Sequence, residues 1–291
     1  MAEQTFLIVQ ADDYGACPAV TDGILAAFAA GVVTQASVMP PAIDAARALW
    51  LARRAALPLG VHLTLVSEWE TLRWYPVTSA PSLRGADGAL LPGVTELREA
   101  ADPAELLTEL RAQVADVRRA GVAPHHLDCH VGVADPAVLA RLSAETGLAS
   151  RDEVPPPGIR MRLDSLWHLS LQPAEHKLAA LLAHVTALPP GVHMIVAHPA
   201  EDGDELRWLC APTSRRWKWA RDIRLSDSTA LLDPAFRETC AANGITLTTW
   251  AALDQTAHRR TTEHNAATTG SGATATQDTD SPAGVRSNRT S

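Results

Sequence analysis

Short apolar runs typical of buried strands alternate along the chain with longer stretches whose apolar positions recur at helical spacing. The strand-like runs cover residues 6–11, 35–39, 59–65, 126–130, 192–197 and 245–249. The helix-like stretches cover residues 18–30, 42–56, 104–120, 136–146, 173–188 and 234–242. This alternation predicts an α/β fold with a mostly parallel sheet, closed or nearly closed into a TIM-barrel-like (β/α) barrel.

Two segments of the barrel region lack this periodicity. The first is rich in Gly, Pro and Trp, and the second is rich in charged residues. They follow the runs at 59–65 and 192–197 and extend to about residue 101 and over about residues 199–226, and we expect both to form long loops at the C-terminal strand face. Residues 255–291 contain no Leu, Ile, Phe, Trp or Tyr, so this segment cannot bury enough apolar surface to offset its ordering entropy. We therefore predict a single (β/α) domain over residues 1–254 and a disordered tail over 255–291.

The net charge bears on the kind of partner, and the cysteine content bears on the cellular compartment. The chain of 291 residues has a formal net charge of −8 and no basic run, which argues against nucleic acid or a membrane surface as a partner. The four cysteines are scattered without a C-x-x-C pair, as in a reducing compartment. We read no secretory signal at the N-terminus. We expect a cytoplasmic protein, either a monomer or a homodimer.

Ionisable side chains stand at the predicted strand ends. The first strand runs into Asp12 and Asp13, the third contains His62, and the late apolar strand ends at His198. Because the carboxyl ends of parallel strands share one face of a barrel, we expect these groups to lie together. On an extended backbone the two neighbouring carboxylates point to opposite sides, which indicates different roles. The structural alternatives are a helix-capping turn for the aspartates and a hydrogen-bonded core position for the histidine.

The run at 126–130 carries the strongest chemical signal. His126, Asp128 and His130 alternate along it, so all three side chains share one face of a strand. Packing alone does not explain three ionisable groups on one face, which favours a functional site. Cys129 points to the opposite face, where a buried spacer is a better interpretation than a nucleophile.

Four motifs occur in order along the chain. They read Ala-Asp-Asp-Tyr-Gly, Gly-Val-His-Leu-Thr-Leu, His-Leu-Asp-Cys-His and an apolar strand that runs into His-Pro. In order and spacing this set resembles the YdjC/ChbG-like carbohydrate deacetylases, over about residues 6–253. The resemblance implies a TIM-barrel-like domain and a metal-dependent hydrolase that removes N-acetyl groups from an amino sugar or a short oligosaccharide.

The resemblance also implies roles for individual residues. Asp13, His62 and His130 would be the ligands of one divalent metal ion, Asp12 the catalytic base, and His198 a second catalytic group and candidate acid. Such a ligand set leaves coordination positions open for water and for a substrate carbonyl oxygen. It suits Zn²⁺, Mn²⁺, Co²⁺ or Mg²⁺, and the residues alone do not choose among them.

Two further residues and two departures complete this interpretation. His126 and Asp128 are expected to orient the ligand imidazoles through hydrogen bonds. Gly132 stands where many family members have one more histidine, and Ala200 replaces the glycine of the His-Pro-Gly motif. The first departure indicates a different subfamily and hence a different substrate, whereas the second is mild.

Indole and guanidinium groups in the two long loops are candidate sugar contacts. Trp69, Trp74 and Trp208 offer aromatic faces to the C–H faces of sugar rings. Arg221 could bind an acidic group on the sugar. The alternatives are that the tryptophans anchor their own loops and that the arginine belongs to a solvated cluster. The cluster comprises Arg215, Arg216, Arg221 and Arg224, and the second loop also holds Trp217 and Trp219.

Two other functions stay open from the residues themselves. Two histidines and a carboxylate also form the site of non-haem iron oxygenases, although those usually stand on a β-sandwich. A non-catalytic, metal-dependent carbohydrate-binding protein is the other alternative. The presence of both Asp12 and His198 argues against it, because binding alone requires neither.

Overall fold

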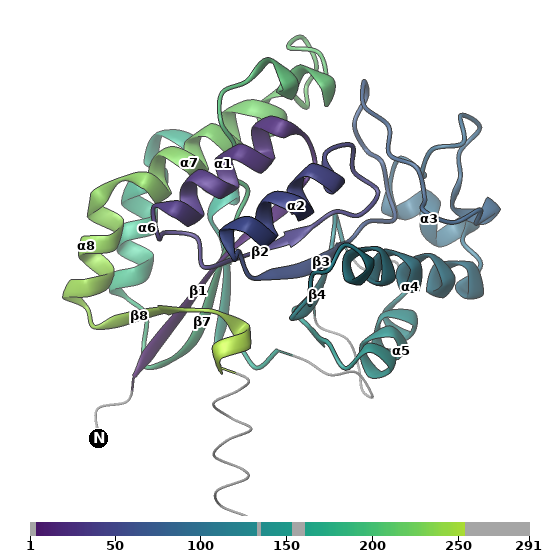
Figure 1. The fold of residues 1–291 in the computed structure, drawn as a ribbon. Helices are drawn as coiled ribbons and strands as arrows, with labels where there is room; N and C mark the ends of the chain where they lie inside the picture. The colour runs from purple at the N-terminus through teal and green to yellow at the C-terminus, as the bar shows by residue number, and fades with distance from the viewer. Residues whose placement is uncertain (1–3, 133–134, 153–160, 254–291) are drawn as a thin grey trace, which may run out of the picture. The chain divides into compact units, whose positions relative to one another are not determined.

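The computed structural model describes residues 4–132, 135–152 and 161–253. The chain divides into the units Met1–Ala252 and Leu253–Ser291, and the predicted tail at 255–291 lies outside the described residues. The first unit is built on an eight-stranded sheet flanked by helices (Figure 1). The strands are β1 (Thr5–Tyr14), β2 (Gln35–Val38), β3 (Leu59–Leu63), β4 (His126–Cys129), β5 (Ala149–Ser150), β6 (Ser165–His168), β7 (Gly191–Ala197) and β8 (Ile245–Thr248).

The sheet curls into an incomplete TIM-barrel-like barrel. Its strands follow the order β5-β4-β3-β2-β1-β7-β6, and β8 pairs with the first half of β1. All of these pairings are parallel. Among the described residues no strand ladder joins the edge strands β5 and β6. The predicted α/β barrel is therefore confirmed in its incomplete form.

Helices cover the outside of the curled sheet (Figure 1). They are α1 (Pro18–Ala29), α2 (Ala45–Ala55), α3 (Val94–Ala100), α4 (Pro103–Arg119), α5 (Pro136–Thr146), α6 (Lys177–Thr186), α7 (Arg224–Leu232) and α8 (Pro234–Ala242). Three of them begin with an Asp-Pro pair, in which Asp102, Asp135 or Asp233 accepts hydrogen bonds from the first turn. The carboxylate satisfies helix N–H groups that otherwise lack partners, and proline has no N–H to satisfy.

The central strand β1 is buried along most of its length. Leu7, Ile8 and Val9 are fully buried, because β1 pairs with strands on both sides and helices pack over the sheet. A strand buried on both faces reads as a continuous apolar run, which makes its position predictable. Towards the C-terminal end its environment becomes polar: Gln10 Nε2 donates a hydrogen bond of 3.0 Å to Ser37 Oγ.

Several segments differ from the sequence prediction. The loop after β3 contains a 3-10 turn, η1 (Pro81–Leu83), as well as α3. The predicted loop at 199–226 contains η4 (Asp204–Trp208), the π-helix η5 (Lys218–Ile223) and the start of α7. The pattern also misses the short strands β5 and β6. Helix α7 lacks an apolar signal because its inward positions include Arg224 and Asp227, which are buried.

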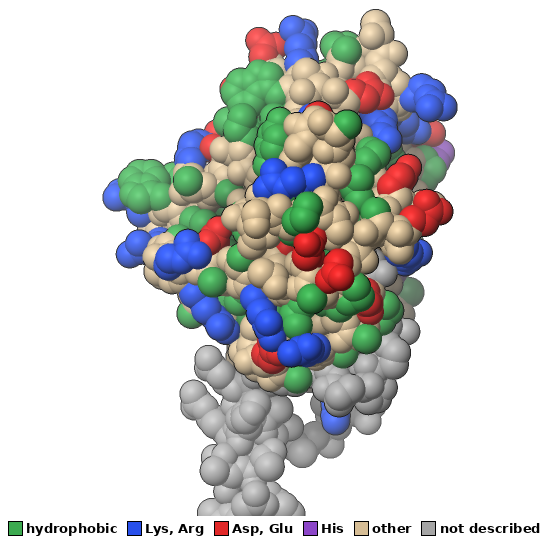
Figure 2. Space-filling model, turned by 90° about the vertical axis from the view of Figure 1, so that its right-hand side faces the viewer, with side chains coloured by type: hydrophobic (Ala, Val, Ile, Leu, Met, Phe, Trp, Pro, Cys, Tyr) green, Lys and Arg blue, Asp and Glu red, His purple; other side chains and the backbone are tan. Residues whose placement is uncertain are grey.

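The surface carries charges of both signs. On the face shown in Figure 2, basic and acidic side chains lie among apolar ones. One ion pair joins α4 to α5, where Arg111 Nη2 lies 2.6 Å from Glu145 Oε1. Exposed pairs of this kind contribute little because water and salt screen them, so burial of the sheet dominates stability. Within the described ranges, no helix combines the length and the apolar character that a bilayer crossing requires.

Candidate active site

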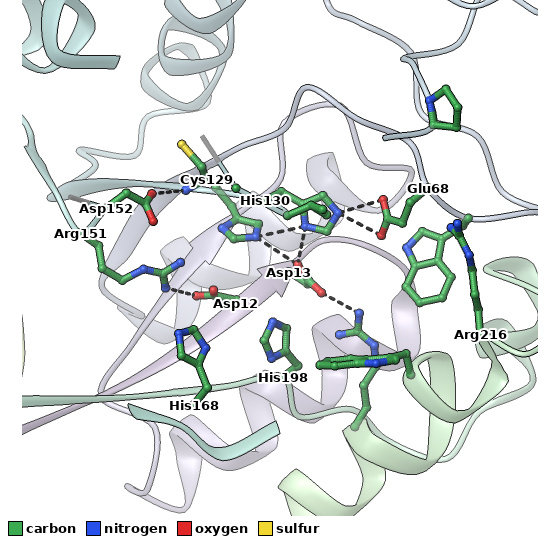
Figure 3. A pocket seen from close by; sticks show the side chains of 17 residues that line it. Asp12, Asp13, Glu68, Cys129, His130, Arg151, Asp152, His168, His198 and Arg216 are labelled. Atoms are coloured by element: carbon green, nitrogen blue, oxygen red, sulfur yellow. Dashed lines mark hydrogen bonds and ion pairs between the residues drawn. The ribbon is translucent and has the colours of Figure 1, made fainter. Parts of the chain in front are cut away.

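A cavity of about 660 Å³ opens at the C-terminal ends of the strands. Residues at or just after the ends of six strands line it, from β1, β3, β4, β5, β6 and β7 (Figure 3). They are Asp12, Asp13, His62, Cys129, His130, Arg151, Asp152, His168 and His198. Loop and helix residues complete the wall, among them Glu68, Trp69 and Arg216 from loops, Trp219 from η5 and Arg224 from α7. The fold thus brings motifs from distant parts of the chain to one face.

The backbone of β1 changes conformation at Asp13. Its φ angle is +67°, and the pairing with β2 shifts register between Ala11 and Tyr14, as at a β-bulge. A regular strand would point Asp12 and Asp13 to opposite sides, as predicted from the sequence. The bulge re-aims the second side chain, so both carboxylates line the same cavity. Positive φ at a residue other than glycine is strained and is common at functional sites.

Three side chains converge on one point of this cavity. Asp13 Oδ1 lies 3.1 Å from His62 Nε2 and 3.1 Å from His130 Nδ1, and the two ring nitrogens are 3.3 Å apart. All three residues are buried. The three metal ligands implied by the sequence motifs are therefore neighbours in the fold, although they come from β1, β3 and the end of β4.

The outer nitrogen of each imidazole faces a carboxylate. His62 Nδ1 lies 2.6 Å from Asp128 Oδ1, and His130 Nε2 lies 3.1 Å from each carboxylate oxygen of Glu68. A carboxylate accepts hydrogen bonds, so each outer nitrogen carries a proton and each inner nitrogen of a neutral ring offers a lone pair. Two lone pairs and one carboxylate oxygen then meet at one point. This donor set fits a divalent cation.

Without a cation, the same carboxylates favour protonated rings. Burial opposes a charge on either imidazole, but neighbouring aspartates raise the pKa of His62 well above its ordinary value. Glu68 and Asp13 likewise outweigh burial and raise the pKa of His130 to about 9. A cation that binds the inner nitrogens must therefore displace protons.

Asp12 pairs with an arginine instead of joining the two imidazoles. Arg151 Nη1 lies 2.7 Å from Asp12 Oδ1 and 3.4 Å from Asp128 Oδ2. Burial opposes ionisation, but the guanidinium outweighs it and holds the pKa of Asp12 below its ordinary value. Asp12, His62 and Asp128 also lie close enough to share a cation, but Arg151 already supplies positive charge there. Asp12 is thus an ionised acceptor beside the three converging ligands.

Arg224 reaches the site from α7. Its Nη2 lies 2.6 Å from Asp13 Oδ2, and its guanidinium lies 6.0 Å from the centre of the Trp69 ring. The prediction that this arginine belongs to a solvated cluster is wrong, because its side chain is only 2% exposed. Burial opposes ionisation of Asp13, but Arg224 and His130 hold its pKa well below the ordinary value. With Oδ2 engaged by the arginine, Oδ1 is the atom directed to the imidazoles.

The two predicted orienting residues differ in what they touch. Asp128 contacts the His62 ring directly. His126 is buried, and its Nε2 lies 3.3 Å from Asp128 Oδ2, but in the described part of the chain neither ring nitrogen has a hydrogen-bond partner of good geometry. A Cβ at Gly60 would lie 2.3 Å from the same nitrogen, so the glycine leaves room for this ring. His126 therefore packs beside Asp128, the carboxylate that contacts the His62 ring.

His198 follows β7 and lines the cavity, with its ring pointing toward Asp12 and Asp13 (Figure 3). Its Nδ1 lies 2.8 Å from Ser170 Oγ. The ring meets the indole of Trp219 edge-on, with 6.1 Å between centroids and 87° between planes. Burial lowers the pKa of this histidine, so the free ring is neutral near pH 7.

The predicted sugar-contact residues divide into two groups. Trp69 lines the cavity, and Trp74 is buried behind it with its ring 5.3 Å from that of His130. Trp208 and Arg221 do not line the cavity. The first of these is 45% exposed, and the second forms a surface ion pair with an aspartate. Only the two tryptophans of the first loop are therefore placed near the converging side chains.

Cys129 lines the cavity wall, but its Sγ is turned away from Asp12 and Asp13 (Figure 3). Its backbone N–H donates a hydrogen bond of 2.8 Å to Asp152 Oδ2. Burial and the neighbouring carboxylate raise the pKa of the thiol well above its ordinary value. A thiol that stays protonated is a poor nucleophile, in keeping with the predicted spacer role.

The motifs do not reveal four residues that shape the site, namely Glu68, Arg151, Ser170 and Asp227. Glu68 and Arg151 lie on loops, Ser170 lies in the 3-10 turn η2 (Leu169–Leu171), and Asp227 lies inside α7. No periodic pattern marks any of these positions. Arg151 follows β5, a strand of only two residues that leaves no apolar run in the sequence. The other three make their contacts through the tertiary fold alone.

Comparison with known proteins decides the family. The sequence profile of the YdjC-like proteins matches residues 6–242. The chain belongs to the YdjC-like family. The match covers β1 through α8, and the resemblance carried by the four motifs is thereby confirmed.

Curated relatives match this YdjC-like protein over part of its length. Carbohydrate deacetylase of Homo sapiens is 38% identical over 135 residues, which cover 43% of this chain and 39% of that protein. Chitooligosaccharide deacetylase of Yersinia pestis (strain Pestoides F) is 34% identical over 131 residues, which cover 44% of this chain and 49% of that protein. The chain thus spans about half the length of the curated relatives it matches.

Solved structures share the fold of this YdjC-like protein. A protein of Enterococcus faecalis V583, to which cellobiose-phosphate cleavage has been attributed, superposes with a TM-score of 0.71 and 26% identity over 86% of this chain and 99% of that chain. A mutant of the peptidoglycan deacetylase PdaC of Bacillus subtilis has a TM-score of 0.50 and 13% identity over 91% of this chain and 97% of that one. The second likeness shows the fold alone.

Proposed function

We propose that this YdjC-like protein is a metal-dependent carbohydrate deacetylase that removes N-acetyl groups from an amino sugar or a short oligosaccharide. The observation that carries the proposal is the convergence of Asp13, His62 and His130 on one point, with Asp12 and His198 in the same cavity. Family membership supports it, as do the names of the relatives from Homo sapiens and Yersinia pestis.

Asp13, His62 and His130 would hold one divalent cation. When bound there, the cation polarises an acetyl carbonyl and lowers the pKa of a nearby water molecule. The chain itself contributes the arrangement of the ligands. Asp128 and Glu68 hold the outer nitrogens of the two rings, so the inner nitrogens point to the same place before the cation arrives.

Asp12 and His198 supply the proton transfers. Asp12, kept ionised by Arg151, accepts a proton from the attacking water, whose oxygen forms the new bond to the acetyl carbon. The proton held by Asp12 then passes through solvent to the lone pair of His198 Nε2. The carbon–nitrogen bond breaks as His198 Nε2 delivers this proton to the leaving nitrogen, and the products are acetate and the free amine. Because burial lowers the pKa of His198, its protonated form is a stronger acid than free imidazolium.

The cavity suits a small carbohydrate. Its volume of about 660 Å³ falls within the range of roughly 300–1,000 Å³ found for small-molecule sites. Trp69 and Trp219 stand in its wall, and their indole faces can pack against the C–H faces of a sugar ring. We therefore assign substrate contacts to these two tryptophans.

Metal analysis coupled to an acetate-release screen tests the proposal. The protein is stripped with a chelator, reloaded separately with Zn²⁺, Mn²⁺, Co²⁺ or Mg²⁺, and incubated with N-acetylated mono- and oligosaccharides. We expect one metal ion per chain and acetate release only from the loaded protein. The His62→Ala/His130→Ala double variant should lose both properties, and the exposed His176→Ala control should keep them.

Two outcomes would contradict this assignment. Tight metal and sugar binding without acetate from any substrate would indicate a non-catalytic, metal-dependent carbohydrate-binding protein. Substrate-dependent oxygen consumption by the iron-loaded protein would instead indicate an oxygenase that uses the same two histidines and carboxylate.

A further inference from the structure

A buried ion pair lies behind His198. Lys177 of α6 and Asp227 of α7 are 1% and 0% exposed, and Lys177 Nζ lies 2.6 Å from Asp227 Oδ1. The lysine also donates a hydrogen bond of 3.2 Å to the carbonyl of Ile223. Removing two charges from water is costly unless their remaining hydrogen bonds are made. The hydrogen bonds that Asp227 accepts through its second oxygen therefore indicate the role of the pair.

The second oxygen of Asp227 faces the start of the loop that carries His198. Asp227 Oδ2 accepts a hydrogen bond of 2.8 Å from the backbone N–H of His198. The same oxygen accepts a hydrogen bond from the hydroxyl of Ser170. Three donors from different parts of the fold thus surround one buried carboxylate, whose oxygens accept all three hydrogen bonds.

The hydroxyl of Ser170 decides where the proton of His198 resides. A serine hydroxyl has a single hydrogen, and that hydrogen points to Asp227. The contact of 2.8 Å between Ser170 Oγ and His198 Nδ1 is then a hydrogen bond donated by the ring. His198 consequently carries its proton on Nδ1, and its lone pair lies on Nε2 at the opposite side of the ring.

We propose that Lys177, Asp227 and Ser170 form a buried chain that fixes His198 as the Nδ1–H tautomer and presents Nε2 to the cavity. The three are positioning residues, because they act through the ring and do not line the cavity themselves. The inference rests on the proposed function for its consequence, since Nε2 is the atom that delivers the proton to the leaving nitrogen. The tautomer itself is a property of the free protein.

Lys177 is the positively charged partner of Asp227 in this buried chain. Burial is the largest influence on His198 and lowers its pKa, whereas Asp13, Asp12 and Asp227 raise it more weakly. The charged groups that act on this ring are Asp12 and Asp13 from β1 and Arg224 and Asp227 from α7.

A second serine–histidine contact lies close by, and its hydrogen bond runs in the opposite direction. Ser165 Oγ lies 2.8 Å from His193 Nδ1, five positions before the Ser170 and His198 contact on each segment. His193 Nε2, however, lies 2.8 Å from the carbonyl oxygen of Pro189. A carbonyl only accepts, so His193 carries its proton on Nε2 and receives the hydrogen bond of Ser165 at Nδ1. One protein therefore holds both tautomers in equivalent serine contacts.

Imidazole ¹⁵N chemical shifts of the full chain read the two tautomers directly, since protonated and lone-pair nitrogens differ widely in shift. Signals are assigned by comparison with the His198→Gln and His193→Gln variants, at a pH at which the spectrum no longer changes with pH. We expect Nδ1–H for His198 and Nε2–H for His193. Ser170→Ala should convert His198 to a mixture of tautomers, and Ser165→Ala should leave it unchanged.

Acetate release then measures the consequence for catalysis. Ser170→Ala should lower kcat roughly tenfold with little change in KM, because the acid acts at bond cleavage and not in binding. An Nε2–H tautomer for His198 in the unaltered protein, or the same tautomer before and after Ser170→Ala, would overturn the inference. If the unaltered protein releases no acetate, the proposed function fails while the tautomer measurement still stands. If Ser170→Ala does not fold, the ¹⁵N shifts of His198 and His193 in the unaltered protein still test the assigned tautomers.

Discussion

Asp12 Oδ1 and Arg151 Nη1 lie 2.7 Å apart in the wall of the cavity, although 139 positions separate them in the sequence. Asp12 belongs to β1 and Arg151 follows β5, and three other strands stand between these two in the sheet. Only the curl of the sheet brings the two side chains together. The contact keeps the proposed catalytic base ionised and fixed in place.

Replacing Arg151 by methionine should impair catalysis without removing the metal. Asp12 loses the guanidinium that lowers its pKa, so the acidic limb of the pH–kcat profile should move to higher pH. We expect kcat near pH 7 to fall about ten- to a hundredfold, with metal content unchanged. Arg141→Met, which removes an exposed arginine of α5, is the matched control. An unaltered pH–kcat profile in Arg151→Met would show that Asp12 is not the catalytic base.

The neighbours Asp12 and Asp13 should respond differently to the same substitution. Asp12→Asn should abolish acetate release and leave metal stoichiometry near that of the unaltered protein. Asp13→Asn should weaken metal binding, because Asp13 Oδ1 is the oxygen that faces both imidazoles. Metal analysis and acetate release on both variants give the answer. Loss of metal in Asp12→Asn would make Asp12 a ligand instead of a base.

Metal binding should release protons. The pKa of His130 in the metal-free protein is raised to about 9 from an ordinary value of about 6.5, so at pH 7 the ring is protonated on both nitrogens. A cation needs the lone pair of Nδ1, and affinity should therefore rise with pH up to about 9. Calorimetric titration at pH 7 in buffers of different ionisation enthalpy counts the protons. A binding enthalpy independent of buffer would contradict the charged state of this ring.

The same raised pKa has a consequence for the metal-free fold. A pKa that folding raises stabilises the folded state below the unfolded value of about 6.5 and loses this effect as pH rises through about 9. The Tm of the metal-free protein should thus decline across this interval, and the Tm of the His130→Gln variant should decline less. An equal decline in both proteins would assign the pH dependence to other groups.

Gly23 of α1 should be intolerant of a side chain. A Cβ there would lie 2.4 Å from the Cα of Ala200, in the loop that begins with His198. Gly23→Ala must displace this loop, at a cost of about 1–3 kcal/mol, and should lower kcat as well as Tm. The exposed Ala29→Gly substitution in the same helix should lower Tm alone. Unchanged kcat in Gly23→Ala would show that the loop adjusts without moving the ring.

The sequence by itself determines the order of strands and helices and the place where chemistry occurs. Continuous apolar runs mark strands buried on both faces, such as β1, and Asp-Pro pairs mark the first turns of α4, α5 and α8. Polar residues at the ends of such runs, such as His62 and His198, indicate the cavity because parallel strands deliver their carboxyl ends to one face. These are local patterns, and a local pattern can be read from one segment at a time.

The tertiary structure decides how those groups are held and charged. The bulge at Asp13 reverses the expected direction of its carboxylate. Arg224, predicted to belong to a solvated cluster, is instead buried and pairs with the same carboxylate. The contacts of Arg151 with Asp12 and of Ser170 with His198 join segments that share no periodicity. Protonation depends on which charges lie within a few ångströms in a dry interior. That neighbourhood exists only once the sheet has curled and α6 and α7 have packed behind β7.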